Sequence, residues 1–206
     1  MNPIRFLFKG KTYHIEDKIY FPSEDSYFLA ENVKIKKGET VIDMGCGSGI
    51  QSLNCLAQGA SKVTAIDINK KAVETTKKNC ETAGYAEKIT AIKSDLFSEC
   101  GENADVIIFN PPYVATDNVK YVELDGGKNG REILDRFLDE MPNYLKQKGR
   151  CIFLQTNING YEETMTKLQK KGFECAIIAR RNDFFEELAV FSCSRGKDFV
   201  FKKTNV

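Results

Sequence analysis

The residues of this chain that could carry chemistry lie in short runs that directly follow apolar segments. The first run alternates glycine with other residues, from Asp43 through Gly45 and Gly47 to Gly49. Glycine has no Cβ, so such a run lets the backbone turn tightly and approach a ligand closely. In an open parallel sheet this turn lies at the strand ends, where ligands bind. Ile50 occupies the sixth position of the dinucleotide fingerprint and no Gly-Lys-Ser/Thr follows, so neither a dinucleotide turn nor a P-loop is indicated.

Acidic residues follow the next two apolar segments of the sequence. Asp67 ends the segment 63–66, and Asp95, with Leu96 after it, follows the segment 89–92. A carboxylate after the second strand can accept hydrogen bonds from both hydroxyls of a ribose. Each aspartate alone is equally consistent with a helix cap. The prediction of a ligand site therefore depends on taking them together with the glycine turn.

The spacing Asp-x-Gly-x-Gly-x-Gly resembles the cofactor turn of S-adenosylmethionine-dependent methyltransferases. The resemblance implies that S-adenosylmethionine is the cofactor and that Asp67 binds its ribose. It also implies that Asp95 accepts a hydrogen bond from the adenine amino group, beside Leu96. Asp43 is expected to neutralise or orient the charged methionine end, and each charge-assisted bond of this kind contributes about 1.5–3 kcal/mol.

The fourth apolar segment, 106–109, ends in the tetrapeptide Asn110-Pro111-Pro112-Tyr113. The prolines fix the backbone, so the Pro111 carbonyl and the Asn110 amide oxygen form a rigid pair of acceptors. This pair could hold the hydrogens of a planar amide or amine nitrogen while its lone pair faces the methyl carbon of a sulfonium. Tyr113 could stack on the planar group and tolerate positive charge. The predicted reaction is methyl transfer to nitrogen, driven by positioning and charge complementarity; the alternative is a turn that merely closes the strand.

Two further segments narrow the resemblance to one family. Asn-Pro-Pro-Tyr resembles the signature of methyltransferases that act on glutamine amides, adenine N6 or related nitrogens. The segments 21–27, Phe-Pro-Ser-Glu-Asp-Ser-Tyr, and 126–132, Gly-Gly-Lys-Asn-Gly-Arg-Glu, resemble motifs of HemK-related protein-glutamine methyltransferases. That family implies that Ser26 contacts the cofactor. The second segment could also be a flexible loop before a helix.

The match is most similar to the compact archaeal and eukaryotic branch of that family, and it extends from about Ile19 to Cys193. The branch implies methylation of the glutamine in the Gly-Gly-Gln loop of a class I translation release factor. It also implies a heterodimer with a small zinc-binding activator protein, for which we expect the strand edge 89–92 to be the contact. Residues 1–15 match no motif of the family.

Other acceptors and one non-enzymatic role are compatible with the same motifs. An adenine-N6 methyltransferase uses the same tetrapeptide, and a flipped base could fill the same slot. Lys70, Lys71, Lys77 and Lys78 recur on one predicted helix face and could meet phosphates, although a solvated face is favoured. A lysine side chain is a third acceptor. A cofactor-binding scaffold without activity is disfavoured, because a scaffold does not need the tetrapeptide.

Positioning these residues requires strands that alternate with helices, which predicts an α/β fold with a mostly parallel sheet. We expect a Rossmann-like class I methyltransferase with seven strands, an antiparallel edge pair and a single domain over residues 1–206. Its core would span 37–206, after an N-terminal extension, 1–36, that holds a hairpin over 4–15 and a helix starting near Pro22 and Ser23. The remaining predicted strands are 40–42, 63–66, 89–92, 106–109, 151–154, 173–179 and 188–193, and the remaining predicted helices are 50–56, 69–84, 131–141 and 161–169.

Composition limits the classes of protein that remain. The chain has 206 residues and a net charge of +1, so no strong electrostatic field argues for nucleic acid or for a polycation. No secretory signal and no apolar stretch of membrane-spanning length is present, which predicts a cytoplasmic protein without a membrane partner. A single histidine, His14, argues against histidine metal sites and triads. We expect the seven cysteines to be reduced thiols, with neither a bridge nor a metal site.

Overall fold

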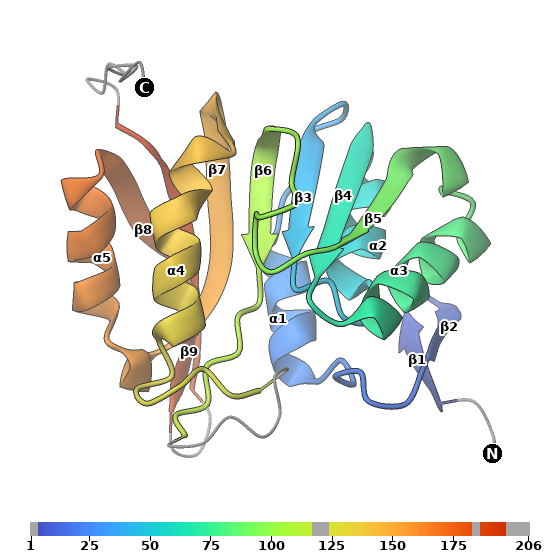
Figure 1. Cartoon of the computed structure of the whole chain (residues 1–206), viewed down its shortest axis with the longest axis horizontal. Helices are drawn as coiled ribbons and strands as arrows, with labels where there is room; N and C mark the ends of the chain where they lie inside the picture. Colours follow the sequence, from blue (N-terminus) through green and yellow to red (C-terminus); the bar gives the residue numbers. More distant parts are fainter. Residues whose placement is uncertain (1–3, 117–123, 183–185, 197–206) are drawn as a thin grey trace.

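Strand order within one sheet defines the architecture of the chain. The computed structural model describes residues 4–116, 124–182 and 186–196. Within these residues, seven strands form a sheet of order β5-β4-β3-β6-β7-β9-β8, and β1 and β2 form a separate antiparallel pair. The strands from β5 to β7 are parallel to their neighbours, whereas β9 is antiparallel to both β7 and β8. The predicted seven-stranded, mostly parallel α/β sheet with an antiparallel edge pair is confirmed (Figure 1).

The elements have the following bounds. The strands are β1 (Ile4–Phe8), β2 (Lys11–Ile15), β3 (Thr40–Met44), β4 (Lys62–Asp67), β5 (Ile89–Lys93), β6 (Ala104–Phe109), β7 (Leu145–Thr156), β8 (Phe173–Asn182) and β9 (Glu187–Arg195). The α-helices are α1 (Glu24–Asn32), α2 (Ile50–Gln58), α3 (Lys70–Thr82), α4 (Glu132–Glu140) and α5 (Tyr161–Lys170). Short 3₁₀ turns are η1 (Ala86–Lys88), η2 (Met141–Asn143) and η3 (Asn157–Asn159).

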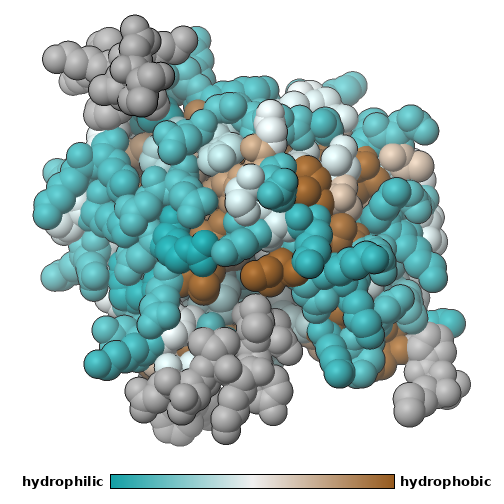
Figure 2. All heavy atoms as spheres, viewed as in Figure 1, coloured by the Kyte–Doolittle hydropathy of each residue, from teal (hydrophilic) through white to brown (hydrophobic). Residues whose placement is uncertain are grey.

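Helices cover both faces of the sheet, which explains why its central strands are almost uniformly apolar. One core cluster joins the sheet to α1, α2, α3 and the β1–β2 hairpin, and the other joins it to α4 and α5. The outward sides of α4 and α5 are hydrophilic, and the apolar side chains visible in Figure 2 gather over the central strands. Helices α4 and α5 are therefore amphipathic, with their apolar sides against the sheet.

The functional end of the sheet is set by the pairing of β3 with β6. Met44 lies opposite Phe109 in this parallel pair. The next residues along the two strands, Gly45 and Asn110, are therefore neighbours at the carboxyl edge of the sheet. The chain order reverses here, because β4 and β5 lie on one side of β3 and β6 on the other. Ligands of open α/β sheets bind at such a switch point.

The N-terminal hairpin packs against α3 and the glycine turn. The Asn79 side chain accepts a hydrogen bond from the His14 backbone N–H at 3.1 Å. It donates to the His14 carbonyl at 2.8 Å and to the Ser48 carbonyl at 2.9 Å. Phe6, Phe8, Tyr13 and Ile15 are buried in the core cluster of α1 and α2. A segment that matched no motif thus supports the loop next to the candidate site.

Two features differ from the expectations drawn from the sequence. Strand β7 begins at Leu145, six residues before its predicted start, and continues through Gly149, where a Cβ would lie 2.9 Å from the Asp105 carbonyl oxygen.

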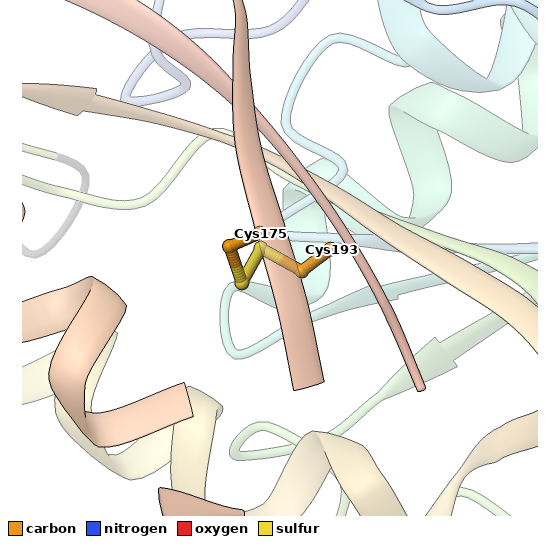
Figure 3. The surroundings of a disulfide bond; sticks show 2 residues. All are labelled: Cys175 and Cys193. Carbon is orange, nitrogen blue, oxygen red and sulfur yellow. A yellow bond between two sulfur atoms is a disulfide. The ribbon is translucent and has the colours of Figure 1, made fainter. Parts of the chain in front are cut away.

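The expectation that no cysteine forms a bridge is wrong, because Cys175 of β8 and Cys193 of β9 form a disulfide (Figure 3). These residues are direct partners in the β8–β9 register, 4.1 Å apart at Cα. Cysteine spacing alone does not encode this register.

Three further observations concern the remaining cysteines, the helices and possible metal ligands. Cys46, Cys55, Cys80, Cys100 and Cys151 are free and buried. No helix in the described residues is both long enough and apolar enough to span a membrane. The same part of the chain contains no cluster of three or more His, Cys, Asp or Glu side chains that could hold a metal ion.

Candidate active site

The glycine turn forms the floor of a pocket at the carboxyl edge of the sheet. Gly45, Gly47 and Gly49 all have positive φ angles, of 62°, 51° and 86°. A Cβ on Gly45 would lie 3.1 Å from the Phe109 ring, and one on Gly49 would lie 3.1 Å from the Cα of Thr76. Left-handed backbone and close packing together require glycine at these two positions. The turn is therefore built to hold its shape and to leave its inner side open to a ligand.

Asp67 lies at the end of β4 and lines the same pocket. Its carboxylate accepts hydrogen bonds from the Gly47 N–H at 3.0 Å and from the Asn69 N–H at 2.8 Å. Asn69 in turn caps α3 by accepting from the Lys71 N–H. Asp67, which the sequence predicts to bind the ribose, thus contacts the glycine turn directly.

Asp43 is directed away from the pocket, unlike the expectation from the sequence. Its carboxylate is fully buried and accepts from the Ser52 N–H at 2.9 Å and the Ser52 hydroxyl at 2.6 Å. Asp43 is not among the residues that line the pocket. It joins β3 to the first turn of α2 and so positions the glycine turn. Burial raises the pKa of Asp43 to about 7, despite the two hydrogen bonds from Ser52.

Asp95 and Leu96 form the side of the pocket beyond β5. Leu96 has a φ of 47° and is buried, whereas the Asp95 side chain is 51% exposed. Asp95 forms an ion pair with Arg136 of α4 at 2.9 Å. Ile68 and Phe109 add apolar surface to the lining. The structure brings an acidic group and apolar side chains together in the lining of one pocket, as a flat, hydrogen-bonding ring requires.

The tetrapeptide meets α1 at the other end of the pocket. Asn110 donates from Nδ2 to the Asp25 carboxylate at 3.0 Å, and the Tyr113 hydroxyl donates to the same oxygen at 3.4 Å. Asn110, Pro111, Pro112 and Tyr113 all line the pocket, and so does Ser26 beside Asp25. All four tetrapeptide residues therefore share one cavity with the glycine turn and Asp67.

Two polar atoms of the pocket-lining residues are buried without a hydrogen-bond partner. One is Oδ1 of Asn110, and the other is Oε1 of Gln51, whose Nε2 donates to the Ser26 carbonyl at 2.8 Å. A buried acceptor that stays unpaired costs about 1–3 kcal/mol. Both residues line the pocket, so a ligand whose N–H donors reach these oxygens would relieve this cost.

The phenols around Asp25 are neutral. Burial raises the pKa of Tyr113 well above its ordinary value, and the Asp25 carboxylate raises it further. Burial and Asp25 likewise raise the pKa of Tyr20 to about 12. The site thus presents neutral hydrogen-bond donors and aromatic faces instead of a strong base.

The segment 126–132 supports the tetrapeptide from outside. A Cβ on Gly126 would lie 2.6 Å from the Pro112 carbonyl oxygen, and Gly130 packs directly on the Tyr113 carbonyl. Asn159 donates to that same Tyr113 carbonyl at 3.0 Å and to the Asn129 carbonyl at 3.1 Å. Arg131 is buried against Asp135 and the Gly160 carbonyl. This segment is therefore a packed support, not the flexible loop that was its alternative.

The sequence did not indicate every residue of the site. Asp25 lies within the recognised segment 21–27, yet only Ser26 was assigned from it. Tyr20 and Gln51 also line the pocket, and neither belongs to a motif quoted above. The only signal for Asp25 was an acidic residue next to a predicted ligand residue, because its partner Asn110 is 85 positions away.

Comparisons with known proteins agree with this geometry. Residues 23–185 match the methyltransferase small domain family. The chain is 39% identical over 193 residues to a Methanocaldococcus jannaschii protein assigned as a protein N5-glutamine methyltransferase, covering 91% of this chain and 97% of that protein. Methyltransferase HEMK2 of Homo sapiens is 27% identical over 192 residues, covering 86% and 90%. The Mtq2–Trm112 complex of E. cuniculi has a chain of similar fold, with a TM-score of 0.69 at 24% identity, covering 87% and 99%.

We expect Asp67→Ala to weaken binding of S-adenosylhomocysteine by about tenfold to a hundredfold, since one charge-assisted contact is lost. Isothermal titration calorimetry measures this loss directly. Glu74→Ala, an exposed change on α3, provides the control. Equal affinities for the Asp67→Ala and Glu74→Ala variants would contradict the assignment of Asp67.

We expect Asp43→Asn to change how stability depends on pH. The folded pKa of Asp43 is raised above that of the unfolded chain, so its contribution is greatest at low pH and is lost as pH rises towards 7. Asparagine can still accept from Ser52 and has no charge to bury. Urea unfolding of the unliganded protein at pH 5 and pH 8 should show the variant gaining stability relative to wild type at the higher pH. A difference that stays constant across this range would contradict the burial argument.

Proposed function

Because this chain belongs to the methyltransferase small domain family and, within it, to the HemK-related protein N5-glutamine methyltransferases, we propose that it methylates a release factor. The donor is S-adenosylmethionine, and the acceptor is the side-chain amide of the glutamine in a Gly-Gly-Gln loop. The M. jannaschii relative, named for glutamine N5 methylation, supports the choice of acceptor. The E. cuniculi Mtq2–Trm112 complex is described as responsible for methylation of the termination factor eRF1, which supports the choice of protein.

The orientation of Asn110 carries this proposal. Its Nδ2 is committed to Asp25, and its Oδ1 is buried and unpaired. The prolines that follow fix the backbone beside it. A primary amide nitrogen has two hydrogens, which suits two acceptors, Oδ1 of Asn110 and the Pro111 carbonyl. Glutamine offers such a nitrogen at the end of a side chain that is long enough to enter a slot.

The lining residues fit the proposed donor. The glycine turn leaves open space on its inner side, Asp67 offers a carboxylate, and Ile68, Leu96 and Phe109 provide apolar walls. When bound, the donor supplies an electrophilic methyl group on a positively charged sulfur. Asp67 would hold the ribose, Asp95 and Leu96 the adenine, and Gln51 with Ser26 the methionine end.

The chain's own residues then lower the barrier by position and charge. Asn110 and the Pro111 carbonyl would hold the acceptor amide in one orientation beside the donor site, which replaces a rare encounter by a fixed geometry. The nitrogen becomes more positive during transfer, so both hydrogen bonds strengthen in the transition state. The face of Tyr113 adds electrostatic stabilisation. The neutral phenols and the absence of a strong base among the described lining residues are consistent with late loss of the proton.

Two of the four lysines on α3 have an acidic neighbour on the same helix. Lys70 lies 3.5 Å from Glu74, and Lys77 lies 3.9 Å from Glu81, as exposed pairs one helical turn apart. Such pairs neutralise each other and contribute little to stability. The adenine-N6 alternative therefore gains no support from this helix.

We further propose that a small activator protein of the Trm112 kind binds the edge of β5. In the described sheet β5 pairs with β4 alone, so its outer edge presents unpaired backbone groups. Such an edge is a template for strand addition. Ala91 and Ile92 are only partly buried, which leaves apolar surface for a partner.

We expect wild-type protein with radiolabelled S-adenosylmethionine to label a Gly-Gly-Gln release factor, but neither its Gln→Ala variant nor DNA. Asn110→Ala should slow transfer by about 10²–10³, the usual effect of losing one transition-state contact, with S-adenosylhomocysteine affinity retained. Scintillation counting and intact-mass analysis measure both. Label on DNA in place of protein, or normal turnover by Asn110→Ala, would overturn the proposal.

We expect this chain and the Trm112-like protein of the same organism to elute together in gel filtration. Ile92→Asp, which places a charge on the β5 surface, should separate them, whereas Lys78→Ala on exposed α3 should not. Separate elution of the wild-type pair would refute the activator, and co-elution of the Ile92→Asp pair would refute the β5 contact.

A further inference from the structure

A buried carboxylate joins α1 to the tetrapeptide. Asp25 is 5% exposed and lies in the first turn of α1. Its Oδ1 accepts from the Tyr20 hydroxyl at 3.0 Å, the Ser23 hydroxyl at 2.6 Å and the Ser26 N–H at 2.6 Å. Its Oδ2 accepts from Nδ2 of Asn110 and from the Tyr113 hydroxyl. One oxygen is thus anchored to the start of the helix, and the other is presented to the tetrapeptide.

Helix α1 lacks a side-chain hydrogen bond at its N-cap, because the N-cap residue bonds to Asp25 instead. Ser23 occupies the N-cap position, but its side chain makes no capping hydrogen bond and donates to Asp25 instead. A serine cap typically contributes about 1 kcal/mol to a helix. The Asp25 side chain lies in the first turn of α1, at the positive end of the helix dipole. No lysine or arginine of the described chain forms an ion pair with Asp25.

A carboxylate that only accepts hydrogen bonds dictates how Asn110 is oriented. The two ends of an asparagine amide have nearly the same shape, so packing alone does not choose between them. Asp25 admits the NH₂ end alone, which turns Oδ1 to the other side, where it has no partner. In the flipped orientation the slot would present N–H donors to an acceptor molecule that itself brings N–H donors. Donation to an anion also polarises the amide and makes its oxygen a stronger acceptor.

We propose that Asp25 is a positioning residue that acts through Asn110: it fixes the amide so that its oxygen receives the acceptor nitrogen's hydrogen. This inference rests on the proposed function, because it assumes that the acceptor brings an N–H group to Asn110. It adds a residue outside the tetrapeptide to the machinery for selecting the acceptor. The hydrogen bonds from Tyr20 and Ser23 would then hold the Asp25 carboxylate in place while it faces Asn110.

A double-mutant cycle tests the coupling between the two residues. Asp25→Asn removes the preference for one amide orientation and should lower the rate of transfer to the release factor by about 10²-fold. Asn110→Ala should have a similar or larger effect. Because Asp25 acts through Asn110, adding Asp25→Asn to Asn110→Ala should change the rate by less than about threefold. Rate losses that multiply in the double variant would overturn the proposal, as would a single Asp25→Asn variant of wild-type rate.

Further measurements separate positioning from loss of structure. Calorimetry with S-adenosylhomocysteine should give the Asp25→Asn variant an affinity within about threefold of wild type. Glu24→Gln, the exposed neighbour in the same helical turn, should leave both the rate and the affinity unchanged. If Asp25→Asn does not bind the nucleoside, the cycle is repeated with Asp25→Ser, which keeps an oxygen that can accept a hydrogen bond. Loss of nucleoside binding in both variants would assign Asp25 a structural role and overturn the inference.

The activity of the wild-type protein distinguishes failure of the proposed function from failure of the proposed role of Asp25. No transfer by wild-type protein to the Gly-Gly-Gln release factor would mean that the proposed function fails. Transfer by wild type that persists at full rate in Asp25→Asn would mean that the proposed function holds and the role of Asp25 does not.

Discussion

The parallel pairing of β3 with β6 is the constraint on which the site depends. It places the ends of two strands side by side, so that the glycine turn and the tetrapeptide, which are 61 positions apart from Gly49 to Asn110, share one cavity. Phe109 packs against Gly45 across this pair. The donor and acceptor halves are thus fixed relative to one another by a hydrogen-bonded ladder. A side-chain movement cannot change their separation without breaking strand pairing.

Patterns that are local in sequence were sufficient to predict most of this fold. Strands buried on both faces are short apolar runs, and helix α3 shows its cap at Asn69 and its left-handed Gly84 in the sequence itself. The glycine turn and the tetrapeptide were also visible, because each is a contiguous run after a strand. Features that depend on long-range register were not predictable. The Cys175–Cys193 bond and the Asp25–Asn110 contact belong to this group, since both arise only once distant segments are paired.

Asp67, Asp43 and Asp25 show why residue type alone does not give a role. Asp67 faces the pocket and also holds the Gly47 N–H. Asp43 precedes the same turn but faces Ser52, away from the pocket, where burial raises its pKa. Asp25 was not singled out by spacing, yet it contacts two residues of the tetrapeptide. The side to which each carboxylate points is set by tertiary packing, and that side decides whether it can meet a ligand.

The support behind Tyr113 has a consequence for the order in which the protein is made. The Tyr113 carbonyl is held by Asn159, which lies 46 residues further along the chain. During synthesis the motif leaves the ribosome well before the residue that secures it. A nascent chain that has folded its first sheet strands can already shape the glycine turn, but it still lacks the brace for the acceptor slot. The acceptor slot therefore reaches the form described here only after residue 159 has been added to the chain.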